Sequence, residues 1–232
     1  MEALKNIETT DKNEKACLDF LTLDKTKWEV KDKTDDYKIS YGTIQMENPL
    51  TNSPEEKICF CLEITLKKPI ETVLKCLNDF NIRKTFDTLY AEGKLVSEKK
   101  EDPEVYIYYL LLKMGFVFSN RDFVVQKKVW KDYKGNKRHH LIHICSTNHS
   151  DYPEKSDPVR GVFLNRAWYL VPGSNEGETF MTLCICIDMR MINVGSFMAI
   201  SKGVDGMKKW VAQFKNKLFF LFYIVFIMLN RL

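Results

Sequence analysis

Arg83 and Asp87 are the two side chains whose types and spacing best suit the binding of a charged ligand. Residues four positions apart lie on one face of a helical turn, so the guanidinium and the carboxylate would face each other. On a protein surface such a pair contributes only about 0.3–0.5 kcal/mol. Inside an apolar cavity, the planar guanidinium would instead hold a phosphate through two hydrogen bonds. Lys113, on a predicted strand, is a further candidate for the cavity wall, or else a solvated residue at a strand edge.

No set of residues has the spacing of a catalytic or metal site. There is no Gly-rich phosphate loop and no Gly-x-Ser-x-Gly elbow. The histidines lie in or beside one predicted hairpin, without a His-x-x-x-His helix or a paired Cys–His spacing, and a solvent-facing hairpin accounts for them. We therefore expect no catalysis, no metal and no cofactor. The histidines are His139, His140, His143 and His149.

The composition is that of an ordinary globular protein, with 45% hydrophobic and 28% charged residues. The net charge of +4 is spread over interleaved Lys, Glu and Asp, which argues against a nucleic-acid surface and leaves a weak attraction to anionic membranes. Four of the seven cysteines form two pairs, Cys59/Cys61 and Cys184/Cys186, and the members of each pair are two positions apart within an apolar strand. This spacing predicts buried, reduced thiols. The first fifteen residues contain no apolar signal region, so we expect a cytoplasmic protein.

The hydrophobic pattern predicts many strands joined by hairpins, with helices before, within and after them. The strand at 105–112 is apolar on both faces, so both faces pack on protein or one faces an apolar cavity. An α+β fold follows, in which a curved antiparallel sheet of about nine strands wraps on the C-terminal helix. The predicted helices are 11–23, 70–78 and 194–217; the predicted strands are two within 28–46, then 57–67, 93–99, 105–113, 122–131, 138–146, 162–171 and 179–189.

The segment 194–217 has the longest helical hydrophobic period in the chain. Gly203 and Gly206 interrupt it, and each costs about 1 kcal/mol against Ala in a helix interior. We therefore expect a bend or a hinge at these glycines. The helix is either a bent core helix or a movable cover over a cavity. Its apolar stripe consists of Phe197, Ile200, Val204, Met207, Val211 and Phe214.

Several motifs resemble, in order and spacing, those of the START family of lipid-transfer domains. They are SNRDFV at 119–124 with KMGFVF before it, RKTFD at 83–87, VRG at 159–161 and GVDG at 203–206. The resemblance covers residues 18–217 and is closest to the phosphatidylcholine-transfer type. It implies a helix-grip fold, in which a curved sheet and the C-terminal helix enclose a hydrophobic tunnel for one lipid.

The resemblance also implies roles for individual residues. The positions that surround choline in phosphatidylcholine binders fall at Leu110, Phe123 and Leu164, of which only one is aromatic. The sequence therefore does not predict choline selectivity. Arg83 and Asp87 match the charged pair near the phosphate and ammonium, which favours a phospholipid over a sterol. The expected tunnel residues are Leu110, Phe123, Leu164, Trp168, Phe197, Ile200, Val204 and Met207.

The run from 218 to 229 is apolar throughout. As a helix it would span about 18 Å, less than the roughly 30 Å core of a bilayer, so it would not cross a membrane. A tail that dips into a membrane, packing on the domain, and an artefact of the gene prediction all remain open. We expect one lipid-binding domain at 1–217 and an apolar tail at 218–232.

The sequence thus predicts a monomeric, non-enzymatic protein that binds one lipid and transfers it between membranes under a helical gate. The expected ligand is a glycerophospholipid, and the expected partner is a transient membrane surface rather than nucleic acid. Two alternatives remain: a lipid-sensing module that signals to a protein partner, and a small-molecule cyclase or hydrolase on the same fold.

Overall fold

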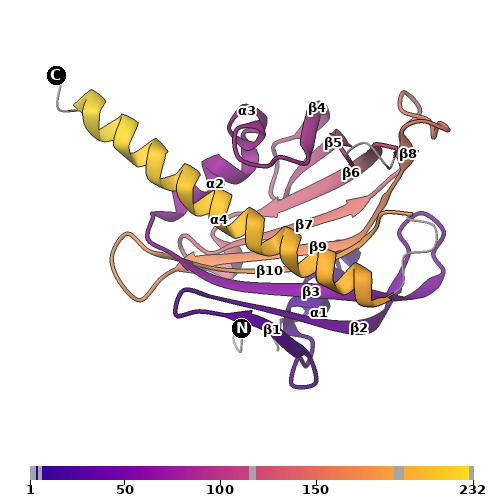
Figure 1. The fold of residues 1–232 in the computed structure, drawn as a ribbon, viewed down its shortest axis with the longest axis horizontal. Coiled ribbons are helices and arrows are strands. Elements are labelled where there is room, and N and C mark those ends of the chain that lie inside the picture. The colour runs from indigo at the N-terminus through magenta and orange to yellow at the C-terminus, as the bar shows by residue number, and fades with distance from the viewer. Residues whose placement is uncertain (1–3, 5–6, 115–118, 191–195, 230–232) are drawn as a thin grey trace.

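A single curved sheet forms the body of the molecule (Figure 1). The computed structural model describes residues 4, 7–114, 119–190 and 196–229, and within the last helix it describes side chains from 198 to 218. The described strands form one ten-stranded sheet in the order β1-β2-β3-β10-β9-β7-β6-β5-β4, antiparallel throughout, with β8 added parallel to β6. The strands are β1 (Glu29–Lys33), β2 (Tyr37–Glu47), β3 (Pro54–Leu66), β4 (Tyr90–Lys99), β5 (Glu104–Leu112), β6 (Arg121–Trp130), β7 (His140–Ser146), β8 (Val159–Arg160), β9 (Val162–Pro172) and β10 (Thr179–Asp188).

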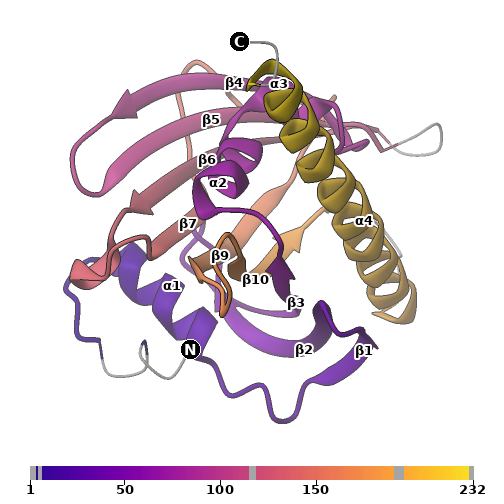
Figure 2. The ribbon, with the colours of Figure 1, turned by 90° about the vertical axis from the view of Figure 1, so that its left-hand side faces the viewer.

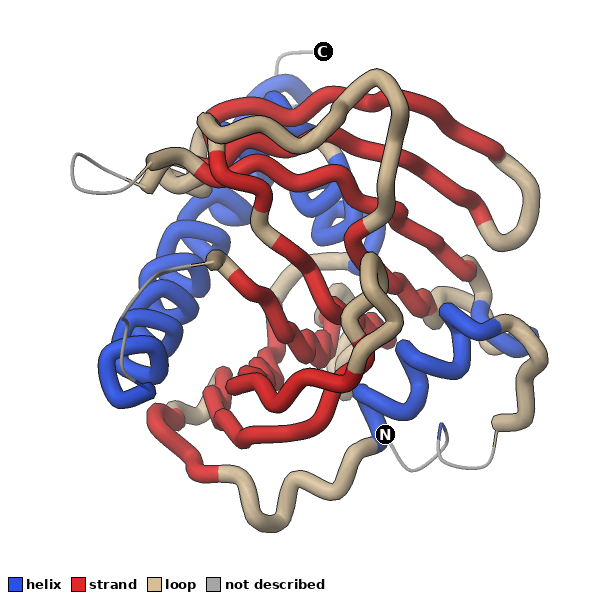
Figure 3. The backbone as a smooth tube through the Cα atoms, turned by 90° about the vertical axis from the view of Figure 1, so that its right-hand side faces the viewer, coloured by secondary structure: helices blue, strands red, loops and turns tan. Residues whose placement is uncertain are grey.

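The helices cover both faces of this sheet. Figure 2 shows α2 inside the curve of the sheet with α4 beside it, and Figure 3 shows α1 and α4 on opposite sides. The predicted α+β helix-grip architecture is confirmed, with α3 and β8 as additions that the sequence did not predict. Among the described residues, no helix has the length and apolarity needed to cross a membrane. The α-helices are α1 (Lys12–Thr22), α2 (Ile70–Asn78), α3 (Phe80–Lys84) and α4 (Ser196–Leu229), and a 3₁₀ turn occupies Tyr133–Gly135.

The outer face of the sheet packs on α1. Asp11 caps this helix by accepting hydrogen bonds from the backbone N–H groups of Asn13 and Glu14, at 2.8 and 3.0 Å. Leu18 and Leu21 of α1 are buried against this face. The prediction of reduced thiols is confirmed, since all seven cysteines are free and buried. Five of them lie in this layer, namely Cys17, Cys59, Cys61, Cys184 and Cys186.

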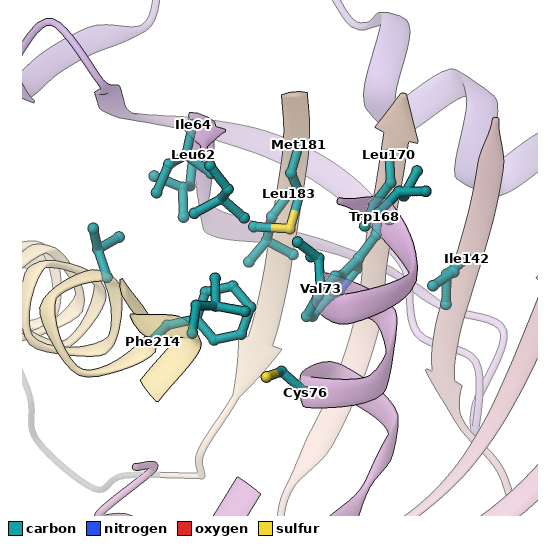
Figure 4. Packing of buried hydrophobic residues seen from close by; sticks show 14 of the residues in the cluster. Leu62, Ile64, Val73, Cys76, Ile142, Trp168, Leu170, Met181, Leu183 and Phe214 are labelled. Atoms are coloured by element: carbon teal, nitrogen blue, oxygen red, sulfur yellow. The ribbon is translucent and has the colours of Figure 1, made fainter. Parts of the chain in front are cut away.

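The concave face packs on α2 and α4. Figure 4 shows Val73 of α2 and Phe214 of α4 directed toward Leu62, Leu183 and Trp168 on the sheet. All five side chains are at least 96% buried. Burial of each such side chain contributes about 1.5–3 kcal/mol, so this layer is a major source of stability. The sheet therefore carries an apolar layer on each face, as the strand patterns indicate.

Two of the sequence motifs contact each other at one end of the sheet. Asp122 of β6 accepts two hydrogen bonds from the guanidinium of Arg160 in β8, at 2.8 and 3.0 Å, and both side chains are buried. Gly161 lets Phe123 approach closely, because a Cβ there would lie 2.3 Å from the ring. Arg121 is buried as well, and its Nε donates to the carbonyl of Met189 at 2.5 Å.

Helix α4 runs without interruption through both glycines that predicted a bend. The predicted kink is absent from this structure, and movement at this point stays a prediction. Gly203 has another role here: a Cβ at this position would lie 2.2 Å from the Phe60 ring of β3, so glycine lets the helix lie against the sheet. Gly206 is exposed, with open space around it. The predicted domain boundary after Lys217 falls inside α4.

Alanine at each glycine separates these two situations. Gly206→Ala raises the free energy of unfolding by about 1 kcal/mol, because an exposed glycine in a helix interior costs this much against alanine. Gly203→Ala gains the same helix propensity but overpacks the contact with Phe60. Its free energy of unfolding is therefore lower than that of the Gly206 variant by about 1–3 kcal/mol. Urea denaturation measures both, and equal gains would contradict the close packing.

Candidate functional site

A small cavity lies between α2 and α3 on one side and strands β5, β6, β7 and β9 on the other. Its volume is about 40 Å³, which is room for a few water molecules. Ligand pockets usually measure about 300–1,000 Å³. The cavity is lined by Leu77, Asn78, Phe80, Arg83, Tyr108, Leu110, Val125, Lys127, Ile142, Ile144 and Trp168.

Aromatic side chains fill part of the interior in which we predicted an open tunnel. Trp210 and Phe214 of α4 stack with 4.6 Å between their ring centroids. Phe214 lies 5.4 Å from Phe86, and Trp210 lies edge-on to Trp168 at 6.3 Å. The described residues therefore leave a small cavity here rather than a space of ligand size, and the tunnel stays a prediction.

Helix α3 positions Arg83 at the edge of the cavity. Asp79 caps this short helix by accepting hydrogen bonds from Asn81 and Ile82. Arg83 then donates from Nε to Asp87 at 3.1 Å, and the two side chains are 17% and 12% exposed. The pair faces each other as the spacing predicts, and it is largely buried rather than solvated.

Two further cations, which the sequence analysis did not single out, lie on the concave face. Lys127 of β6 pairs with Ile144 of β7, and Ile144 pairs with Arg166 of β9, so the three occupy one row across the sheet. Strands are about 4.8 Å apart, which separates the backbones of Lys127 and Arg166 by about 10 Å. Lys127 donates to the side-chain carbonyl of Asn78 in α2. Both cations are buried, at 7% and 6% exposure.

Each of the three cations lies over an aromatic ring, in the geometry of a cation–π contact. These contacts help offset the loss of hydration, although a cation–π contact is worth only about 0.5–2 kcal/mol. The cation and ring pairs are Arg83 with Tyr90 at 4.7 Å, Lys127 with Tyr106 at 5.9 Å and Arg166 with Trp168 at 4.5 Å.

Burial and mutual repulsion weaken the protonated forms of Lys127 and Arg166. Burial lowers the pKa of Lys127 to about 7, and the charges of Arg83 and Arg166 lower it further while Glu104 opposes them. Burial also lowers the pKa of Arg166 to about 9, with Arg83 adding repulsion and Asp87 opposing it. Repulsion from Arg83 acts on both groups, so this interior disfavours a further positive charge.

Several buried polar atoms at this site have no hydrogen-bond partner among the described residues. They include Arg166 Nε, Trp168 Nε1 and the Tyr90 hydroxyl. Leaving a buried polar group unsatisfied costs about 1–3 kcal/mol, and more for a charged one. These atoms mark the place where a polar ligand group would be stabilised.

The predicted site residues divide into those that meet at the cavity and those that do not. Leu110 and Trp168 line it, and Phe123 is buried in the neighbouring core with Tyr90. Leu164 lies on the other face of the sheet, toward α1, because a register shift in β9 turns it outward. Its assignment to the tunnel wall therefore does not fit this structure.

Lys113 also lies away from the cavity. It follows β5 as an exposed residue, and its backbone N–H donates to the Leu89 carbonyl at 2.8 Å. On α4, the side chains of Ile200, Val204 and Met207 pack on the concave core, as the helical stripe predicts. The side chain of Phe197 lies outside the described part of the helix.

The prediction that the histidines lie on a solvent-facing hairpin is wrong for two of them. His140 and His143 are buried, at 9% and 3% exposure. Burial lowers the pKa of His143 to about 4, so it is neutral near pH 7. His139 bonds to the Tyr169 hydroxyl at 2.9 Å, and the half-buried His149 accepts a hydrogen bond from the backbone N–H of Asp151 at 3.2 Å. Within the described ranges, no group of three His, Cys, Asp or Glu side chains is placed to hold a metal.

Substitution of Lys127 tests the burial of its charge. Above about pH 7 the folded protein loses the Lys127 proton, whereas the unfolded chain keeps it up to the ordinary pKa of 10.5. Stability therefore rises with pH across this window, and the full cost of burying the charge is present below it. Urea denaturation from about pH 6 to pH 9 should give a steeper rise for the wild type than for Lys127→Met. Parallel curves would show that Lys127 titrates normally.

No family model and no curated protein sequence matches the chain. Human STARD10 matches with a TM-score of 0.73 and 13% identity, over 93% of this chain and 82% of that one. Human StAR-related lipid transfer protein 5 gives 0.68 and 16%, over 84% and 88%. The lipid transfer and protein localization domain of human StarD13 gives 0.63 and 21%, over 82% and 88%.

These identities are low, so the likeness establishes a shared architecture and not a shared ligand. The matches extend over most of each chain, and they include the curved sheet and the C-terminal helix. The phosphatidylcholine-transfer subtype stays a prediction. This chain has the helix-grip fold of the START lipid-transfer domains.

Proposed function

We propose that this protein binds a single lipid between the concave face of its sheet and α4, and transfers it between membranes without catalysing a reaction. The observation that carries this proposal is a cluster of cations beneath a helix that covers an otherwise apolar interior. A lipid matches both features, because its apolar chains suit the apolar interior and its polar head group suits the cations. The ligand we favour is a glycerophospholipid, with Arg83 holding the phosphate and Asp87 orienting Arg83.

The physical task of such a protein is to lower a barrier. A diacyl lipid carries about thirty methylenes, and exposing them to water would cost on the order of 25 kcal/mol, at about 0.8 kcal/mol each. An interior as apolar as the bilayer makes the membrane-bound and protein-bound lipid nearly equal in free energy. The protein then speeds exchange in both directions without driving net transport.

Entry requires α4 to act as a gate. Its inner face is apolar, with Val211 and Phe214 fully or almost fully buried. Near the β1–β2 hairpin it is held by two ion pairs, Lys208 with Asp32 at 3.1 Å and Lys215 with Asp36 at 2.9 Å. Exposed pairs of this kind contribute about 0–1 kcal/mol each, so they are easily exchanged for anionic membrane groups. Gly203 and Gly206 are the proposed hinge.

The C-terminal part of α4 is the proposed membrane contact. The helix continues to Leu229, and its end projects beyond the sheet in Figure 1. Residues 218–229 are all apolar in sequence, so every face of this segment suits the acyl region of a bilayer. Lys209 and Lys217 lie just before it and suit anionic head groups. We place the protein in the cytoplasm, as a monomer that visits membranes peripherally.

Transfer is tested with labelled phospholipid moving from donor to acceptor vesicles. The wild-type protein should speed transfer, and native mass spectrometry should find one lipid per chain. Arg83→Ala should lower the bound fraction about tenfold or more, because a hydrogen bond to a charged group contributes about 1.5–3 kcal/mol. If the protein retained lipid but did not transfer it, the lipid-sensing alternative would be favoured. If the protein bound no lipid, the proposal would be wrong.

The membrane contact is tested separately, by vesicle flotation. Phe222→Asp together with Val225→Asp should reduce binding to phosphatidylserine-containing vesicles about tenfold or more, since two charges in the acyl region oppose insertion. Asp substitutions at Ser156 and Ser174, which are exposed on the body of the protein and change the net charge by the same amount, serve as the control for added negative charge. Equal losses in both proteins would indicate a purely electrostatic attraction.

A further inference from the structure

The interior holds more positive charge than its own acidic groups can balance. Arg83 and Lys127 line the cavity, Arg166 lies in the same row of the sheet as Lys127, and within the described residues the carboxylate that pairs with one of these cations is Asp87. Asp87 is already bonded to Arg83 at 3.1 Å. The next carboxylate, Glu104, lies at the start of β5 and is bonded by Lys131 at 2.6 Å. Lys127 and Arg166 are therefore left without an ion-pair partner in the described structure.

Arg166 is the most informative of the three. Its side chain is buried, and its Nε has no hydrogen-bond partner among the described residues. The guanidinium lies over the ring of Trp168 in a cation–π contact. The indole N–H of Trp168 is unsatisfied as well. An unpaired buried charge is destabilising by several kcal/mol, which a fold of marginal stability sustains only if something offsets it. The missing partner is an acceptor that carries negative charge.

We infer that Arg83, Lys127 and Arg166 form an internal oxyanion site that selects lipids whose head group carries a net negative charge. This inference rests on the proposed function and names the class of lipid. The site accepts a phosphate that has no ammonium attached, as in phosphatidic acid or phosphatidylglycerol. Arg83 and Arg166 would donate to its oxygens from planar guanidinium groups, and Lys127 would add a third donor.

A zwitterionic choline head group fits this interior poorly. Its quaternary ammonium would need an aromatic face, but the faces of Tyr90, Tyr106 and Trp168 are each occupied by one of the protein's own cations. The ammonium would also enter an interior that disfavours a further positive charge. The same three cations that attract the phosphate therefore disfavour the group that follows it in phosphatidylcholine.

The experiment loads the full-length protein from three kinds of vesicle and counts bound lipid by native mass spectrometry. The vesicles contain phosphatidylcholine alone, phosphatidylcholine with phosphatidic acid, or phosphatidylcholine with phosphatidylglycerol. The wild-type protein should take up either anionic lipid about ten- to a hundredfold in preference to phosphatidylcholine, as expected for one or two charge-assisted hydrogen bonds. The double variant Lys127→Met, Arg166→Met should lose this preference. Lys137→Met, which removes the same kind of charge from an exposed turn, should keep it.

Thermal unfolding of lipid-free protein supplies an independent measurement. Arg166→Met should unfold at the same temperature as the wild type or higher, because replacing an unpaired buried charge by an apolar side chain is neutral or stabilising. Inorganic phosphate should raise the unfolding temperature of the wild type and not that of Arg166→Met.

The outcomes separate this inference from the proposed function. Equal or preferred uptake of phosphatidylcholine by the wild type overturns the anion selectivity and leaves lipid transfer standing. A drop in the unfolding temperature of Arg166→Met overturns the inference too, because it means that Arg166 has a structural partner. If no lipid binds but phosphate still stabilises the wild type alone, the oxyanion site stands as a site for free phosphate and the transfer function fails.

Discussion

The structure depends on one constraint, which is that both faces of the sheet are apolar and must be covered. Helix α1 covers the outer face through Leu18 and Leu21, and α2 and α4 cover the concave face through side chains such as Val73 and Phe214. The outer layer is closed by α1. The concave layer is closed by α2 and by the last described helix, α4, which is the gate that we propose.

The buried cations Lys127 and Arg166 lie within this apolar interior. Lys127 and Arg166 lose hydration without gaining a carboxylate, and their pKa values fall accordingly. The cation–π contacts recover only part of this loss. Such an arrangement is costly for folding alone, and it is expected where a ligand completes the charge balance.

The motifs that carry the family resemblance are largely structural. Asp122 and Arg160 join β6 to β8, Gly161 admits the ring of Phe123, and Gly203 admits Phe60 under α4. These contacts fix how strands meet and how closely the gate lies, which every member of a fold needs whatever it binds. The residues to which we assign the selection of the ligand lie elsewhere, on the inward positions of β6 and β9.

The sequence by itself determined the elements other than α3 and β8, their order along the chain and the sheet class, because hydrophobic period is a local property that each longer strand and helix carries. It also determined that Arg83 and Asp87 face each other, since their spacing spans one helical turn. It could have indicated Lys127 and Arg166, which interrupt otherwise apolar inward positions. Only the tertiary structure decided that these two cations share a row with Ile144, that Leu164 faces away, and that aromatic side chains fill part of the interior. Those facts depend on strand register and side-chain packing between segments far apart in the chain, which no local pattern encodes.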